Sequence, residues 1–520
     1  MTETTSRWSR RRRRRSTTRT ILLLLALALL IRLVVVVVAA GAKPTDSVSD
    51  SGYHARLLHD PIGHLEGNVA AVDQYAPYLG VAEWITAKPW VALGASDLTA
   101  LRLGSVVWDL AGMAILLAGI ARWRPRCVLL AGLIWAVAPV MWPASAFAAQ
   151  DEPFAAAIVA AAVVLVIRRH RRAALVLLVF GCSAAKVLLG PVVLAFLLTA
   201  PRATRRREWI TVAVTAVGLA AVTWVVSGSD GLSQQFGYTP GNIGFSMTPW
   251  STLVLHHVVT VNTANRTAIV LAGVAIVGVV ALWSRHREDG EEGGYRLAAA
   301  LLLACFALLA VSNPEYLCVV MPLAIVASTT IEGLQVPWGF LVVATLAWAV
   351  DLVYYFLRRA YDPTGTLLGR DGFQGDLSGS VRVLDAVHQA LLLFLLVAVV
   401  VVAWRWAAGP LSGEVDASSP RRRAIPVRAR ARARADQPVD QPTSGAGVGT
   451  ADSSASAVGT LEGAVEEPAH TNRAVTVAMA LVLIGSTVAA LIFYTVAVAI
   501  VLGVVALVFL GGAFFVDRDY

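Results

Sequence analysis

An acidic and aromatic stretch follows the first apolar run of the chain. It reads DSVSDSGYHARLLHDP and places Asp46 and Asp50 four residues apart, with Tyr53 close behind. If the stretch begins helically, the two carboxylates share one face. Partial desolvation beside an aromatic ring raises the pKa of a carboxylate, which suits a general base that takes a proton from a hydroxyl group. The alternative is an ordinary acidic flank of a membrane span, and the stretch alone does not decide between them.

Two further polar segments open apolar runs. AAQDEPFAAA places Gln150, Asp151 and Glu152 at the start of one predicted helix. VSNPEYLCVVMPLAIV places Glu315 and Tyr316 at the start of another. Acidic groups in the first turn of a helix are stabilised by its dipole, and proline is tolerated there. Each segment is therefore either part of a binding site or an ordinary helix start.

Lys186 lies in SAAKVLLGP, inside an apolar run where a charge is unfavourable. A lysine at the bilayer centre costs about 2.5–3.5 kcal/mol and by default indicates a functional site with an anionic partner. The alternative is a short helix whose lysine side chain extends to the membrane interface.

Three histidines in the first loop raise the question of a metal site. His54, His59 and His64 recur every five residues, a spacing that does not align side chains on one helical face. With Asp60 and Glu66 they could bind a divalent ion through a loop, but histidines without further ligands are usually plain surface groups. The four cysteines show no CxxC spacing. We therefore predict no metal ion and no other cofactor.

The composition indicates which elements must position these groups. Of 520 residues, 57% are hydrophobic and only 15% are charged, with a mean hydropathy of +0.67. A soluble protein of this length would need a far more charged surface. A helix needs about 20 apolar residues to cross the hydrocarbon, and runs such as residues 21–40 meet that requirement. The expected fold is an all-α, polytopic membrane helical bundle with long outside loops carrying short helices.

The basic residues fall in blocks beside the apolar runs. These blocks include SRWSRRRRRRST, ARWRPR, IRRHRR, PRATRRREW and RRRAIPVRARARARA. Such blocks mark cytoplasmic loops, so the net charge of +9 reflects membrane topology and not nucleic-acid binding. We predict a multi-pass membrane protein with a cytoplasmic N-terminus and with the acidic loops on the outer face. No small-residue cleavage site follows the first run, so we expect the first span to be retained.

The flanking charges divide the chain into a basic cytoplasmic tail (1–20), a transmembrane domain of about 12 spans (21–407), a linker (408–472) and a C-terminal transmembrane hairpin (473–520). The linker has no apolar periodicity and is rich in Arg, Ala, Pro and Ser, which predicts a disordered cytoplasmic segment. Single spans are expected at 21–40, 98–120, 127–146, 154–167, 209–227, 266–284, 295–312, 316–334, 336–357 and 384–406.

The apolar run over residues 173–200 has basic flanks at both ends. A single crossing would place one flank outside, against the positive-inside rule. We therefore expect a broken pair of short helices that enters and leaves on the cytoplasmic side, split between Gly181 and Lys186. Broken helices within a membrane are tolerated where they line a protein cavity, so we expect function here.

The order of these motifs resembles that of the GT-C membrane glycosyltransferases, particularly the bacterial mannosyltransferase-like branch that uses polyprenyl-phosphate sugars. The resemblance covers roughly residues 20–406. The motifs that carry it are DSGY, DQYAPYLGVAEW, LRLGSVVWDL, AQDEPFAAA, AKVLLGPVVL and NPEYLCVVMPL. Two features depart from the family: Ala149 stands where the family favours glycine, and the first loop has no tight pair of acids.

The resemblance implies transfer of a sugar, a mannose-like hexose, from a polyprenyl-phosphate donor to a glycolipid or cell-envelope glycan at the outer face of the bacterial cytoplasmic membrane. Asp50 is the expected base for the acceptor hydroxyl and Asp46 the second choice. A single displacement would invert the anomeric configuration, and the leaving phosphate would need nearby cations. The expected donor- and acceptor-binding residues are Tyr53, Tyr75, Arg102, Gln150, Asp151, Glu152, Lys186, Arg266, Glu315 and Tyr316.

Two other classes of protein remain as alternatives. A secondary transporter or lipid flippase would also have about twelve helices and a lysine in a broken pair. A purely structural membrane partner is the other. No internal repeat relates the two halves, and the acidic residues gather in outside loops instead of at the midplane, which favours the enzyme.

Overall fold

The computed structural model describes residues 2–41, 58–65, 78–185, 187–237, 248–256, 258–285, 291–309, 313–330, 336–361 and 379–408. The chain divides into two compact units, Met1–Gly409 with Met479–Tyr520, and Pro410–Ala478. All described residues belong to the first unit. Residues 409–520, which include most of the predicted linker and the final hairpin, lie outside the described residues.

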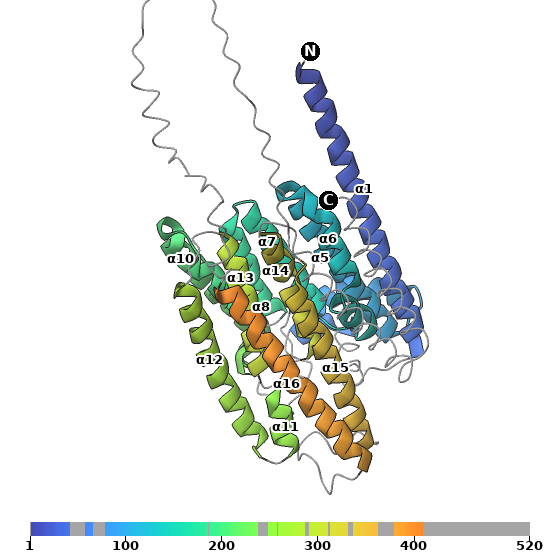
Figure 1. Cartoon of the computed structure of the whole chain (residues 1–520), viewed down its shortest axis with the longest axis vertical. Helices are drawn as coiled ribbons and strands as arrows, with labels where there is room; N and C mark the ends of the chain where they lie inside the picture. The colour runs from blue at the N-terminus through green and yellow to red at the C-terminus, as the bar shows by residue number, and fades with distance from the viewer. Residues whose placement is uncertain are drawn as a thin grey trace, which may run out of the picture. The chain divides into compact units, whose positions relative to one another are not determined.

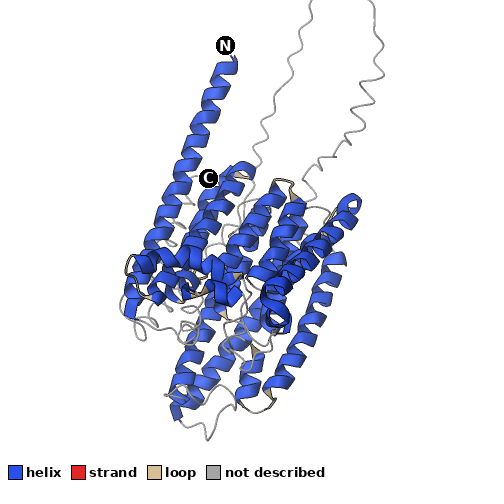
Figure 2. Ribbon diagram, turned by 180° about the vertical axis from the view of Figure 1, so that it is seen from behind, coloured by secondary structure: helices blue, strands red, loops and turns tan. Residues whose placement is uncertain are grey.

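Every regular element within these ranges is helical (Figure 2). Among them, five helices are long and apolar enough to cross a membrane. They are Ser16–Val38 in α1 (Thr2–Val38), α5 (Asp97–Trp123), Arg202–Gly228 in α10 (Arg202–Gly237), α12 (Val261–Arg285) and Val381–Ala408 in α16 (Gly379–Ala408). The all-α prediction is confirmed for the described part, and these helices are those of a membrane protein.

Shorter apolar helices coincide with the other predicted single spans. They are α6 (Val128–Val137), α7 (Glu152–Ile167), α13 (Glu291–Leu308), α14 (Leu317–Thr330) and α15 (Trp338–Tyr361). The predicted span 127–146 is too long, because α6 ends two residues before Pro139. Proline lacks the N–H that a helix needs and restricts the residue before it. The chain then makes a π-helical turn, η3 (Pro143–Phe147), before α7 begins.

Short helices lie in the predicted outside loops, namely α3 (Pro61–Leu65), α4 (Leu79–Ala92) and α11 (Pro249–Leu255). Helix α4 packs closely on α5 at Gly104, where an added Cβ would lie 3.0 Å from the Cβ of Ala87. Helix α5 also packs on α7 through Gly112 and Gly119. The small residues let the two backbones approach, as is common between membrane helices. Helix α5 therefore fixes the positions of both α4 and the start of α7.

The broken pair consists of α8 (Arg171–Ala184), η4 (Val187–Leu189) and α9 (Gly190–Leu198). The interruption falls after Ala184, within the predicted split between Gly181 and Lys186, and Gly181 lies inside α8. A Cβ at Gly181 would lie 2.6 Å from Leu189, so this glycine serves close packing and does not break the helix. At the other end of the pair, Arg171 donates to the Phe196 carbonyl, which brings the start of α8 to the end of α9.

Figure 1 shows α7, α13 and α14 between α10 and α12 at one edge of the view and α1 at the other. Helix α7 is buried along most of its length and contacts α5, α8 and α14, while α13 contacts α9, α12, α14 and α16. Helices α10, α12 and α16 expose large apolar side chains, among them Val217, Val274 and Phe394. In a membrane protein such faces contact lipid, because lipid tails are as apolar as the side chains themselves.

Candidate functional site

A shallow pocket lies where α4 and α5 meet the start of α7; about 290 Å³ lies between its walls when open solvent is included, and about 20 Å³ of this admits a water-sized group. Its polar lining comes from Glu83 and Thr86 of α4, Ser105 of α5, and Gln150 and Asp151 in the turn before α7. The sequence predicted a site at the last two positions, and the structure adds the first three. Carboxylate, amide and hydroxyl groups thus converge from three segments.

Asp151 occupies the N-cap position of α7, but its side chain makes no capping hydrogen bond. The residue is 4% exposed and lines the pocket. An aspartate that merely started the helix would accept a hydrogen bond from a backbone N–H of the first turn. Capping therefore does not account for the position of this carboxylate.

The turn that carries Asp151 has an unusual backbone and is tied to α5. Ala149 has φ of 57°, in the left-handed region that disfavours any residue with a Cβ. The Ser105 hydroxyl donates to the Gln150 carbonyl over 2.7 Å, and the Gln150 N–H donates to the Ala144 carbonyl over 3.0 Å. The left-handed conformation at Ala149 gives a physical reason why glycine suits this position.

Two aromatic rings form part of the apolar lining of the pocket. The ring centroids of Trp108 and Phe154 lie 4.7 Å apart, with an interplanar angle of 56°. Both residues line the pocket, one from α5 and one from the first turn of α7. Aromatic walls with a few placed polar groups are the usual composition of small-molecule sites. The pocket thus presents an aromatic wall and several polar groups to a ligand that reaches its mouth.

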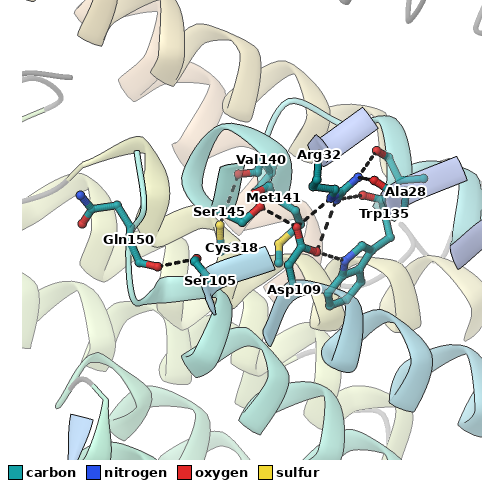
Figure 3. A network of polar contacts seen from close by, with 11 residues as sticks. Ala28, Arg32, Ser105, Asp109, Trp135, Val140, Met141, Ser145, Gln150 and Cys318 are labelled. Atoms are coloured by element: carbon teal, nitrogen blue, oxygen red, sulfur yellow. Dashed lines mark hydrogen bonds and ion pairs between the residues drawn. The ribbon is translucent and has the colours of Figure 1, made fainter. Parts of the chain in front are cut away.

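A second polar cluster lies deeper along α5 and is closed (Figure 3). Arg32 of α1 and Asp109 of α5 form an ion pair of 2.9 Å, and both side chains are 0% exposed. The indole N–H of Trp135 and the hydroxyl of Ser145 donate to the two Asp109 carboxylate oxygens, each over 2.8 Å. We call these four residues the Arg32–Asp109 network.

The same network completes the end of α6. The Arg32 guanidinium donates to the Ala136 carbonyl over 2.6 Å and to the Trp135 carbonyl over 3.2 Å. The last carbonyls of a helix lack partners within the helix, and α6 ends abruptly ahead of Pro139. The Cys318 thiol of α14 donates to the Val140 carbonyl over 3.3 Å in the segment that follows. The network thereby holds the non-helical segment between α6 and α7.

Arg102 joins three segments near the pocket. It is fully buried, and it donates to the Ala39 carbonyl over 2.6 Å and to the Phe147 carbonyl over 2.9 Å. These bonds connect the end of α1 and the turn η3 to α5. The sequence predicted a cation that binds a phosphate, whereas these contacts make Arg102 a group that positions the segments around the pocket.

The other predicted residues lie in several places. Glu152 and Glu315 are buried at the starts of α7 and η5. Tyr316 is half-buried, and Arg266 is exposed on α12 and is not among the pocket-lining residues. Asp46, Asp50, Tyr53, Tyr75 and Lys186 lie outside the described residues.

Within the part of the chain that the structure describes, no group of three or more His, Cys, Asp or Glu side chains is arranged to hold a metal ion. His59 instead lies 3.1 Å from Asp97 at the start of α5, with both side chains substantially exposed.

No protein-family model and no curated protein matches the sequence. The function must therefore be argued from the geometry of the site and from the order of the motifs.

Sequence reasoning did not single out Glu83, Trp108 or Arg32. Glu83 is one of many acids in the first loop, and only the packing of α4 on α5 distinguishes it from the others. A signal for Arg32 was present, because a charge within an apolar run that is long enough to span a membrane requires a partner.

Proposed function

We propose that the chain is an integral-membrane glycosyltransferase. It transfers a mannose-like hexose from a polyprenyl-phosphate donor to a glycolipid or cell-envelope glycan at the outer face of the bacterial cytoplasmic membrane. The observation that supports this most directly is the Asp151 carboxylate, which lines a pocket with Glu83 and Gln150 and does not cap its helix. The order of the sequence motifs is the second support.

In the proposed reaction the acceptor hydroxyl attacks the anomeric carbon of the sugar. The new C–O bond forms as the bond to the phosphate oxygen breaks, so the configuration inverts in one displacement. A carboxylate takes the hydroxyl proton, and Asp50 is our choice for this base. Asp151 and Glu83 bind sugar hydroxyls, and Trp108 contacts the apolar face of the ring. Lys186 and Arg266 stay candidates for binding the anionic polyprenyl phosphate as it leaves.

The test compares wild type with Asp151→Asn, both purified in detergent and both checked by thermal unfolding. Transfer is measured from a radiolabelled polyprenyl-phosphate mannose to a membrane glycolipid extract. We expect a loss of about 100-fold or more, the lower end of what a positioned catalytic or transition-state group contributes. The matched control is Asp97→Asn, which removes an exposed acid near the start of α5 and should retain activity. Equal activity in wild type and Asp151→Asn would show that this carboxylate has no role in sugar transfer.

One observation favours a second candidate, a secondary transporter or lipid flippase. The Arg32–Asp109 pair is fully buried between helices long enough to span the membrane, and buried charges of this kind often mark transport pathways. Proteoliposomes holding a fluorescent polyprenyl phosphate separate the two functions. Movement of intact lipid across the bilayer that Asp109→Asn abolishes, with no sugar transfer by wild type, would establish the transporter instead.

A further inference from the structure

Two basic blocks that are distant in sequence meet in the fold. IRRHRR joins α7 to α8, and PRATRRREW begins α10. The Arg171 guanidinium of the first block lies 2.9 Å from the Glu208 carboxylate of the second, and α8 packs on α10. Residues within one or two turns of this ion pair therefore form a continuous surface, which we call the basic junction.

The basic junction exposes many positive side chains. The exposed basic residues are Arg168, Arg169, His170, Arg172, Arg202, Arg206 and Arg207. The acidic residue in this region, Glu208, is only 2% exposed. Its carboxylate pairs with Arg171 and accepts a hydrogen bond from the Thr204 hydroxyl over 2.9 Å. Its charge is therefore already paired beneath the surface, and the exposed arginines carry a strong net positive charge.

An exposed apolar face begins directly beside these arginines. Trp209 and Ile210 follow Arg207 with 46% and 52% of their surface exposed, and Val214 and Val217 continue this face along α10. A change from arginines to an indole and then to aliphatic side chains is typical of a helix that passes from the headgroup level into the hydrocarbon. The arginines then lie at the height of lipid phosphates, which accept paired hydrogen bonds from guanidinium groups.

We infer that the basic junction binds the phosphate groups of anionic membrane lipids at the predicted cytoplasmic surface. The site is connected to the broken helix pair, because Arg171 also donates to the Phe196 carbonyl and to the Thr199 hydroxyl at 3.2 Å. Lipid phosphates on the surrounding arginines hold α8, α9 and α10 together at this end. The inference does not depend on the proposed sugar transfer.

The test removes four exposed arginines in one variant, Arg168→Gln, Arg169→Gln, Arg206→Gln and Arg207→Gln. Binding of a fluorescent phosphatidylglycerol to the full chain in detergent is measured by titration. One basic residue near an anionic surface contributes roughly fivefold to affinity, so we expect binding on the order of several hundredfold weaker. The two halves, Arg168→Gln with Arg169→Gln and Arg206→Gln with Arg207→Gln, should each lose roughly 25-fold by the same reasoning. They keep the test decisive if the fourfold variant does not fold.

The matched control is Arg285→Gln with Arg405→Gln, which removes two exposed arginines from the last turns of α12 and α16. It should bind phosphatidylglycerol as wild type does. A second readout is thermal unfolding in nanodiscs of phosphatidylcholine with and without phosphatidylglycerol. The anionic lipid should raise the Tm of wild type and control but not of the fourfold variant.

Several outcomes would overturn the inference. If the control weakened lipid binding as much as the fourfold variant does, the binding would not be specific to the basic junction. If the half variants bound the lipid as wild type does, the basic junction would not be the lipid site. Competition by inorganic phosphate as strong as that by lipid would indicate a site for a small anion instead. Displacement of the lipid by a single-stranded RNA at lower concentration than by phosphatidylglycerol would indicate a nucleic-acid surface.

Discussion

The pocket beside α7 and the Arg32–Asp109 network both contain side chains of α5, but the first is a pocket and the second is enclosed by protein. Ser105 and Asp109 lie one turn apart on α5, yet Ser105 lines a pocket and Asp109 is wholly enclosed. Both Asp109 oxygens accept hydrogen bonds from Arg32, and each accepts one more, from Trp135 or from Ser145. Asp151 is 4% exposed, lines the pocket and makes no capping bond. The contacts of Asp109 are those of a structural carboxylate, whereas Asp151 lies at a pocket where a ligand could reach it.

The largest effect on stability is expected for Arg32→Met, which leaves the buried Asp109 charge without its cation. Breaking a buried ion pair in this way costs about 3–5 kcal/mol. Unfolding in detergent, followed by circular dichroism, measures the loss. Arg266→Met is the control, because it removes an exposed arginine from α12 and should change stability by less than about 0.5 kcal/mol.

The double variant Arg32→Met with Asp109→Leu should regain most of the lost stability, because replacing both charges by apolar groups is often neutral. If Arg32→Met cost no more than Arg266→Met, the network would not have the structural role assigned to it.

A smaller loss is expected for Trp135→Phe, which removes the indole N–H that donates to Asp109. A hydrogen bond to a charged group contributes about 1.5–3 kcal/mol, while Arg32 and Ser145 still bind the carboxylate. Trp404→Phe, at a site 45% exposed on α16, gives the matched comparison. Similar Tm values for the two variants would show that the indole N–H adds nothing.

Ala149→Gly should stabilise the protein. The left-handed backbone of an L-residue costs roughly 1–2 kcal/mol, and the greater freedom of glycine in the unfolded chain offsets roughly 0.5–1 kcal/mol of the relief. The expected gain in the free energy of unfolding is about 0.5–1 kcal/mol. Ala156→Gly makes the same substitution inside α7 and should destabilise by about 1 kcal/mol. If both variants changed the free energy of unfolding in the same direction, the backbone strain assigned to Ala149 would be contradicted.

Substitutions of the carboxylates beside the pocket are expected to change stability least and activity most. Asp151→Asn and Glu83→Gln preserve shape beside the pocket and should change the free energy of unfolding by less than about 1 kcal/mol. Both should still lower sugar transfer, Asp151→Asn by about 100-fold or more. A destabilisation as large as that of Arg32→Met would make the pocket a second structural cluster and remove the contrast with the network.

Much of the fold follows from local patterns in the sequence. Apolar length predicted α1, α5, α6, α7, α10 and α12 to α16, and paired basic flanks predicted two short helices over residues 173–200 in place of one. The error in the predicted span 127–146 is local and has a physical cause, because Pro139 ends α6 earlier than the apolar run does.

The site was predictable only in part. Gln150 and Asp151 were identified because polar residues at the start of an apolar helix are conspicuous, and the pocket contains both. Glu83 was not, because no local pattern distinguishes one acid in a long loop from its neighbours. Arg102 was predicted as a ligand-binding cation, but its bonds to the Ala39 and Phe147 carbonyls depend on chain segments that are far apart in sequence.

The sequence by itself determined that this is a helical membrane protein, because the free energy of placing apolar runs and charges in or beside a bilayer depends on composition and order along the chain. The tertiary structure alone decided which polar residues are enclosed and which border a pocket. That distinction depends on contacts between distant helices, such as Arg32 with Asp109 and Arg171 with Glu208. Small residues such as Gly104 and Gly112 likewise bring α4 and α7 close to α5, which becomes apparent only when the helices come together.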